Sequence, residues 1–320
     1  MGKSSTGSNK SSHTQSSGAQ SEKQSDDYDA HRSKNKNSRP TGNGIQGDFV
    51  KKLEPFLEGL YKYYFRCDVT GWENMPADKA LFVGNHNGMI TYEVLMMFYA
   101  WWKKFGNERK ALGLAHNVAL NNPFFKWLIP KIGAIPANPE KALAALNNGY
   151  SLLVYPGGEK EAFRPYTERK KVDFYQRKGF IRLALNAKVP IVPVVSIGAH
   201  ESYVILSRGE EIAKRLGLYD KYRLHGVPIT FRSLFLMWCL TTGVFTFFPL
   251  LLVPSVALSL FIPMPAKMTF KILPPIDVTA LYDHSKDEES NLQTIYNHIL
   301  AAMQSALTEG YAQRRLPVIG

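Results

Sequence analysis

The sequence predicts an α/β fold in which a mostly parallel sheet is flanked by helices. From residue 68 onward, short apolar runs take turns with amphipathic segments, which is the order that parallel strands with crossover helices produce. The apolar run 80–83 predicts a buried strand, and the apolar run 94–99 that follows it predicts a buried helix. The 320 residues suffice for one large domain or two small ones.

Each expected element rests on its own pattern of apolar residues. Strands are expected at 69–72, 80–83, 111–115, 132–136, 151–155, 190–197 and 267–273. Helices are expected at 48–65, 94–99, 122–128, 139–147, 173–187 and 285–313. The stripe along 285–313 is expected to pack on the sheet.

Composition divides the chain into three parts. Residues 1–47 are mostly Ser, Asn, Gly, Lys and Gln, so they cannot bury enough surface to offset their ordering entropy, and we expect a disordered basic tail. Residues 48–67 carry a helical apolar stripe rich in aromatics, which predicts an amphipathic interfacial helix or, equally, a helix packed on the domain. Residues 68–320 are expected to form the main domain.

A long apolar segment, 233–266, interrupts the second half of that domain without a single charged residue. Its length would allow a membrane span. Gly243, Pro249, Pro254 and Pro263 argue against one clean spanning helix, because proline removes a backbone donor and kinks a helix. We expect a membrane-associated insertion that dips into the bilayer, with a buried core element as the alternative.

The formal net charge of +12 favours anionic partners such as a phospholipid surface, a phosphorylated cofactor or nucleic acid. Nucleic acid is disfavoured because the aromatic residues lie in apolar runs, away from the basic clusters. The two cysteines, Cys67 and Cys239, are far apart and fit neither a disulfide framework nor a metal site, and no secretory signal opens the chain, so a reducing compartment is expected.

His86 comes three residues after the strand at 80–83, near the strand end where α/β folds usually bind ligands. Glu93 comes seven residues later, and a turn between them would let its carboxylate reach the imidazole. A carboxylate on one ring nitrogen fixes the tautomer, so the other nitrogen can take a proton from a hydroxyl. No nucleophile-elbow Ser, Cys or Thr stands nearby, so the hydroxyl would belong to a substrate. A helix-capping or core histidine is the alternative.

A second motif, Tyr155-Pro156-Gly157-Gly158-Glu159-Lys160-Glu161, follows the strand at 151–155. Backbone N–H groups of such a turn can point at a ligand oxygen. Lys160 and Arg164 lie beside it, and further cations between 169 and 182 suggest a site for phosphate groups or merely a solvated helix face. The third motif, Val189-Pro190-Ile191-Val192-Pro193-Val194, carries two prolines, which marks a special strand at the rim of a site.

In order along residues 68–275, these pieces resemble the glycerolipid (lysophosphatidate-type) acyltransferase superfamily. The motifs that carry the resemblance are Asn85-His86, Ile132-Gly133-Ala134-Ile135-Pro136, the Pro-Gly-Gly turn at 156–158 and the strand 189–194. The Pro-Gly-Gly turn resembles the branch that includes diacylglycerol acyltransferase-like proteins. Two features depart from the usual pattern. The position five after His86 is Thr91 instead of Asp, and the turn lacks the Arg that the family uses for the acceptor phosphate.

The resemblance implies transfer of a fatty acyl group from acyl-CoA to the hydroxyl of a glycerolipid, either lysophosphatidate or another lysophospholipid. It implies His86 as the general base, Glu93 as its orienting acid, and Gly157, Gly158, Lys160, Glu161 and Arg164 as the oxyanion and acceptor site. No cofactor or metal is implied beyond the acyl-CoA donor. The protein would act at a phospholipid membrane with its site facing the cytoplasm. The alternatives are a diacylglycerol or neutral-lipid acyltransferase, and a non-catalytic membrane-bound scaffold.

Overall fold

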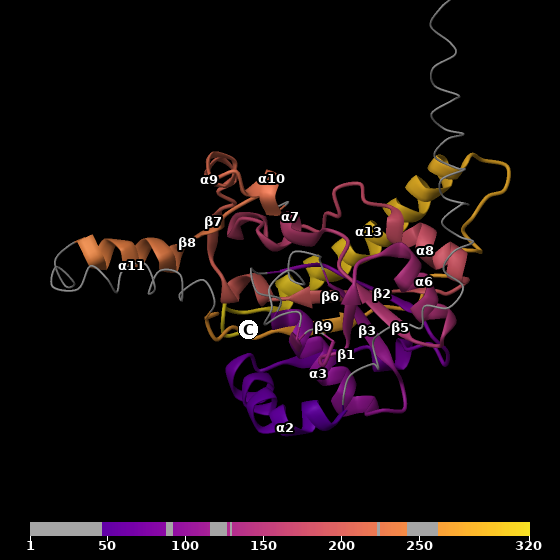
Figure 1. The fold of residues 1–320 in the computed structure, drawn as a ribbon, viewed down its shortest axis with the longest axis horizontal. Coiled ribbons are helices and arrows are strands. Elements are labelled where there is room, and N and C mark those ends of the chain that lie inside the picture. The colour runs from indigo at the N-terminus through magenta and orange to yellow at the C-terminus, as the bar shows by residue number, and fades with distance from the viewer. Residues whose placement is uncertain (1–46, 88–91, 116–126, 129, 223–224, 242–261) are drawn as a thin grey trace, which may run out of the picture. The chain divides into compact units, whose positions relative to one another are not determined.

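The computed structural model describes residues 47–87, 92–115, 127–128, 130–222, 225–241 and 262–320 (Figure 1). The predicted tail at 1–47 therefore lies almost wholly outside the described residues, as does most of the predicted helix at 122–128.

A seven-stranded sheet forms the centre of the domain, in the order β1-β9-β6-β2-β5-β3-β4. Strands β6, β2, β5, β3 and β4 pair in parallel, whereas β9 runs antiparallel to β6. The bounds are β1 Asp68–Thr70, β2 Leu81–Gly84, β3 Ala111–Ala115, β4 Ala134–Pro136, β5 Ser151–Val154, β6 Ile191–Ile197 and β9 Thr269–Ile272. The predicted mostly parallel sheet is confirmed.

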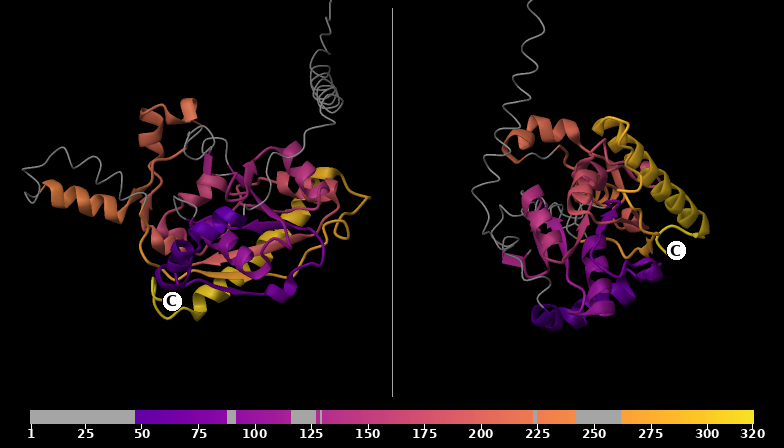
Figure 2. Two further views of the ribbon diagram at one scale, coloured as in Figure 1. Left: turned by 60° about the horizontal axis from the view of Figure 1, so that its bottom comes forward. Right: turned by 90° about the vertical axis from the view of Figure 1, so that its right-hand side faces the viewer.

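Helices cover both faces of this sheet. Successive strand residues point to opposite sides, and here both sets of side chains are apolar, so each face needs a covering layer. Leu81 and Val83 of β2 pack with apolar residues of α6 Pro139–Asn147, α8 Gly179–Ala187 and α13 Glu288–Gln313. Phe82, between them, packs on the other face with α2 Gly47–Glu58 and α3 Tyr92–Phe105. Figure 2 shows α13 and α2 on opposite sides of the strands.

The helix expected at 173–187 begins only at Gly179, as α8. Tyr175 and Gln176 both have positive φ angles, of 52° and 58°, which no α-helix accommodates. Residues 173–178 therefore form a loop beside the second motif. The helix expected at 48–65 is present as α2 and the π-helix η1 Gly59–Tyr64. Its interfacial role stays a prediction.

Strand β6 is an interior strand, although prolines are usually confined to strand edges, starts and bulges. Pro190 precedes its first residue, and Pro193 lies just before the stretch Val194–Ile197 that pairs with β9. The two prolines, which lack a backbone N–H, therefore lie before the residues of β6 that form hydrogen-bonded pairs with β9.

Between β6 and β9 the chain forms an excursion that periodicity did not predict. It contains η4 Ala199–Ser202, β7 Ile205–Ser207, α9 Glu210–Arg215, α10 Leu218–Tyr222, β8 Ile229–Thr230 and α11 Phe231–Thr241. Shorter helical turns elsewhere are η2 Trp72–Asn74, α7 Gly158–Ala162 and η3 Tyr166–Glu168. Strands β7 and β8 pair antiparallel as a separate sheet.

Most of the apolar segment predicted at 233–266 falls outside the described residues, which omit 242–261. Within the part of the chain that is described, no helix has the length and apolar character needed to cross a bilayer. The membrane insertion stays a prediction.

The central position of β5 in the sheet can be tested with a variant of Leu152. The backbone of this residue pairs with β2 on one side and β3 on the other, and its side chain is fully buried in the core on one face of the sheet. Replacing Leu152 with Ala should lower the free energy of unfolding by about 2–5 kcal/mol, because the lost methyl groups leave a cavity. Urea unfolding measures the change. The matched control is Leu316→Ala, at a side chain that is 54% exposed, which should change stability by less than about 0.5 kcal/mol. Equal losses in the two variants would contradict this packing.

Candidate active site

The site lies where β2 ends, and two asparagines hold that strand end against β6. Asn85 donates from Nδ2 to the Ser196 carbonyl (3.0 Å), and its Oδ1 accepts the Ser196 N–H (2.7 Å). Asn87 donates to the same carbonyl (3.2 Å) and to Ser196 Oγ (3.1 Å). Both side chains are buried. Because buried polar groups are costly when unpaired, these bonds fix the backbone on either side of His86.

His86 and Glu93 are brought together by the start of α3. His86 Nδ1 lies 2.5 Å from Glu93 Oε1, which also accepts the Asn87 N–H at 3.1 Å. The Glu93 side chain is 1% exposed and that of His86 is 13% exposed. The pair is therefore shielded from water, and the carboxylate makes Nδ1 the protonated ring nitrogen. This leaves Nε2 to act as an acceptor.

The Pro-Gly-Gly turn packs against the same strand end. A Cβ atom on Gly84 would lie 2.4 Å from the Tyr155 ring, so only glycine lets that ring reach β2, and there it lies 5.0 Å from the His86 ring. Gly158 has a φ of 54° and its N–H donates to the Tyr155 carbonyl (3.1 Å). Since this N–H closes the turn, the structure gives no support to the oxyanion role predicted for it.

Glu161 follows the turn in α7 and reaches back to the His86 backbone. Its Oε2 accepts the His86 N–H at 3.0 Å. A Cβ on Gly157 would lie 2.1 Å from that oxygen, so the glycine leaves room for the carboxyl group. Arg164 Nη2 lies 3.6 Å from Glu161 Oε1, and neither side chain is more than 1% exposed.

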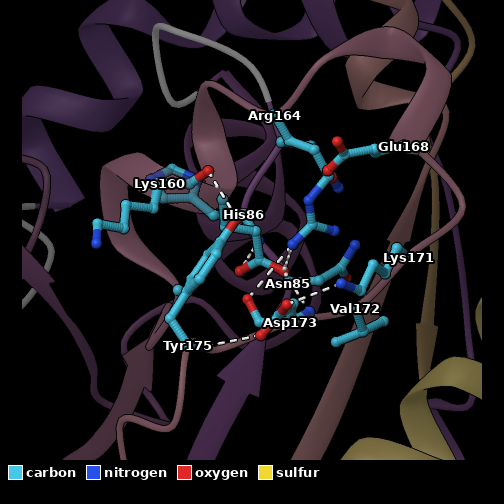
Figure 3. Close-up of polar contacts among 12 residues, drawn as sticks. Asn85, His86, Lys160, Arg164, Glu168, Lys171, Val172, Asp173 and Tyr175 are labelled. Carbon is cyan, nitrogen blue, oxygen red and sulfur yellow. Dashed lines mark hydrogen bonds and ion pairs between the residues drawn. The ribbon is translucent and has the colours of Figure 1, made fainter. Parts of the chain in front are cut away.

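Of the cations that the sequence placed in the acceptor site, Arg164 points inward and Lys160 is half-buried (Figure 3). Arg164 donates to the Asp173 carbonyl at 3.4 Å. Lys160 has its Nζ 5.9 Å from the centre of the Tyr175 ring, and its carbonyl accepts the Tyr175 hydroxyl at 3.0 Å. The acceptor-binding roles of both stay predictions.

Several of the cations between 169 and 182 have acidic partners in the structure. Lys171 pairs with Asp173 (3.0 Å), Lys178 with Glu289 (2.5 Å) and Arg182 with Glu288 (2.7 Å). Exposed pairs of this kind contribute about 1 kcal/mol or less each, and they reduce the charge available to a ligand. The contacts favour the alternative of a solvated face for these three cations.

Burial and neighbouring charges set the protonation of the site. Burial lowers the pKa of His86, but the Glu93 carboxylate and, more weakly, Glu161 outweigh it and raise that pKa above its ordinary value. Burial raises the pKa of Glu161 to about 7, against the opposing effect of Arg164. Burial also raises the pKa of Tyr155, which keeps its hydroxyl neutral. Of the two groups in contact, Glu161 has a pKa of about 7, and His86 has a pKa above its ordinary value.

Sequence reasoning placed Tyr155 in the second motif but assigned no role beside His86 to it, to Ser196 or to Asn87, which the structure places around His86. Ser196 lies 109 residues from Asn87 along the chain, so no local pattern connects them. A contact of Glu159 with His225 from the excursion was also missed. Asn87 alone gave a usable signal, because a polar residue directly after the His lies at the same strand end.

Comparisons with known proteins match part of this chain to a known family. The sequence profile of the acyltransferase family matches residues 66–197, which run from just before β1 to the end of β6. This segment therefore matches the acyltransferase family, in agreement with the resemblance drawn from the four motifs, all of which lie within it.

Curated proteins are similar to part of this chain. An uncharacterized protein of Mycobacterium tuberculosis is 32% identical over 167 residues, which are 52% of this chain and 47% of that protein. A protein of Gallus gallus named "DGAT1/2-independent enzyme synthesizing storage lipids" is 30% identical over 190 residues, 58% of this chain and 55% of its own. The chain spans about half the length of the curated relatives it matches.

Among solved structures, the 1-acyl-sn-glycerophosphate (LPA) acyltransferase PlsC of Thermotoga maritima aligns with a TM-score of 0.49 at 17% identity. The alignment covers 84% of this chain and 83% of PlsC.

The raised pKa of Glu161 gives a pH dependence of stability. Its folded value of about 7 exceeds the ordinary 4.5, so the folded chain holds this proton more tightly than the unfolded chain. Its contribution to stability is therefore fully present below pH 4.5 and is lost as the pH rises towards 7. Urea unfolding near pH 5 and near pH 8 should show that wild type loses more stability over this interval than Glu161→Gln. A larger loss in the variant would contradict the sign.

Proposed function

We propose that this chain transfers a fatty acyl group from acyl-CoA to the hydroxyl of a glycerolipid. The observation that carries the proposal is the 2.5 Å contact between His86 Nδ1 and Glu93 Oε1 at the end of β2. It gives the imidazole a fixed tautomer and raises its basicity, which is what removal of a proton from an alcohol requires. The match to the acyltransferase family supports acyl transfer as the reaction class.

The proposed reaction needs one base and no enzyme nucleophile. His86 Nε2 takes the hydroxyl proton while the lipid oxygen forms a bond to the thioester carbonyl carbon. The tetrahedral intermediate then collapses, the carbon–sulfur bond breaks, and the CoA sulfur leaves with the proton that the imidazolium returns. Glu93 stabilises the imidazolium between these steps. A backbone N–H near Gly157 is the candidate donor to the oxyanion.

The acceptor is either a lysophospholipid such as lysophosphatidate or a neutral lipid such as diacylglycerol. Lysophosphatidate would need a cation on its phosphate, and Lys160 is the half-buried candidate in the motif. Diacylglycerol carries no phosphate, and it is favoured by the burial of Arg164, which is 1% exposed and turned towards Glu161. The name of the Gallus gallus relative points the same way.

We also propose that the protein works on a phospholipid membrane through the excursion between β6 and β9. Helix α11 exposes large apolar side chains, which suits contact with a bilayer interface. They are Phe231, Leu234, Phe235, Met237 and Trp238. The charge of +12 favours an anionic lipid surface. The site would face the cytoplasm, where the charged acyl-CoA donor is available.

The proposed base His86 and its orienting acid Glu93 are tested with the variants His86→Ala and Glu93→Gln in a purified membrane fraction. Loss of the general base should lower acyl transfer by about 10²- to 10⁴-fold, and loss of the orienting carboxylate should lower it by a smaller factor. Release of free CoA, followed with a thiol reagent, measures the rate. The control is His298→Ala, at an exposed position of α13, which should keep wild-type activity. Wild-type rates in His86→Ala would remove this residue from the base role.

The acceptor is tested by offering lysophosphatidate, other lysophospholipids and diacylglycerol to the wild-type protein. If the buried Arg164 does not reach the phosphate and only Lys160 contacts it, CoA release with diacylglycerol should exceed that with lysophosphatidate. The variant Lys160→Met should then lower the rate with lysophosphatidate only. A protein that releases no CoA with any acceptor would be a scaffold, the remaining alternative.

A further inference from the structure

Glu161 and Arg164 form a buried charged pair directly behind His86, not on a surface that a substrate reaches. Neither side chain is more than 1% exposed. The carboxyl group accepts two backbone N–H groups, from His86 at 3.0 Å and from Asp173 at 3.5 Å. The guanidinium completes the unit by donating to the Asp173 carbonyl at 3.4 Å. The pair thus joins the end of β2 to the loop before α8.

We propose that Glu161 and Arg164 position His86 and tune its basicity, instead of binding the acceptor as the motif suggested. The proposal rests on the proposed function in that His86 is the base whose position matters. Glu161 fixes the backbone of His86 while Glu93 fixes its ring, so the two carboxylates hold the residue at both ends. Arg164 keeps the Glu161 carboxyl in its buried place.

Geometry argues against a role for Arg164 on a substrate phosphate. Its guanidinium would have to leave Glu161 and the Asp173 carbonyl to reach a ligand, and a buried carboxylate would lose its cationic partner. Breaking one half of a buried ion pair is costly because the remaining charge has neither water nor partner. A positioning role needs no such rearrangement.

The glycine at position 157 supports the same assignment. A Cβ there would lie 2.1 Å from Glu161 Oε2 and 2.5 Å from Glu161 Cβ. The turn therefore uses a residue without a side chain where the carboxyl group passes on its way to the His86 N–H. The first glycine of the Pro-Gly-Gly motif makes room for a buried carboxylate.

The Glu161 carboxylate is also close enough to affect the protonation of the His86 imidazole. The Glu161 carboxylate raises the pKa of His86, and its own pKa is about 7. Burial and nearby cations lower the pKa of His200 in η4 to about 3, so this ring stays neutral. Among the described residues, the titratable groups that interact with Glu161 or Arg164 from the surrounding elements are His86, Tyr155, Asp173, His200 and Tyr296.

The test compares Glu161→Gln, Glu161→Asp and Arg164→Met with the matched control Glu159→Gln. Glu159 lies in the same helix but contacts His225 instead of His86. The first readout is the pKa of His86, followed by NMR in histidine-labelled full-length protein and assigned with His86→Gln. Glu161→Gln should lower this pKa by about half a unit or more, Glu161→Asp should restore part of the shift, and Glu159→Gln should leave it unchanged.

The second readout is the pH profile of acyl transfer. Glu161→Gln should move the acidic limb of kcat/KM to lower pH and reduce kcat about tenfold, because a base held less firmly spends less time in the reactive geometry. Arg164→Met should reduce kcat while leaving the KM for lysophosphatidate within about twofold. A tenfold rise of that KM with unchanged kcat would overturn the proposal in favour of acceptor binding.

The two readouts separate this proposal from the proposed function. An unchanged His86 pKa in Glu161→Gln overturns the positioning role whatever the activity. A shifted pKa in a protein that transfers no acyl group supports the positioning role and defeats the proposed function. If a single variant fails to fold, the double variant Glu161→Gln/Arg164→Met removes both buried charges together, which interiors tolerate better. A lowered His86 pKa in the double variant supports the positioning role, and an unchanged one overturns it.

Discussion

The organisation of this protein depends on holding one histidine between two buried carboxylates that come from different helices. Glu93 at the start of α3 contacts the His86 ring, and Glu161 in α7 accepts its backbone N–H. Buried carboxylates are expensive unless they are paired, so each must keep its partners, and the chain on both sides must stay where those partners are. The cost of desolvation therefore makes the site rigid.

The sheet supplies the frame for that constraint. Strands β2, β5 and β6 are parallel neighbours, so their carboxyl ends meet at one edge, and each is followed by a piece of the site. After β2 comes His86, after β5 comes the Pro-Gly-Gly turn, and the last residues of β6 include Ser196, which holds Asn85 and Asn87. Residues far apart in the chain meet there because parallel pairing aligns the strand ends.

The fold could be predicted to a large extent from apolar periodicity. The elements that were predicted wrongly, or not at all, differ from the prediction for local physical reasons. Helix α8 starts later than its amphipathic pattern because two residues of the loop before it take positive φ angles. The excursion with β7, β8 and α11 was not predicted, since its elements are short and the pattern of the apolar segment fits several structures. The π-helical turn η1 also gave no signal, because its apolar stripe resembles that of an ordinary helix.

The order of amino acids was enough to specify the strands of the central sheet, most of the helices that cover it, the motifs shared with the acyltransferase family and the candidate pair His86 and Glu93. These follow from local spacing, which a chain carries without folding. Three features of the site came from three-dimensional packing alone: Arg164 is buried against Glu161, the Gly158 N–H closes the turn, and Ser196 holds both asparagines. Burial and hydrogen bonding depend on what lies beside a residue in space, and residue types alone do not specify that.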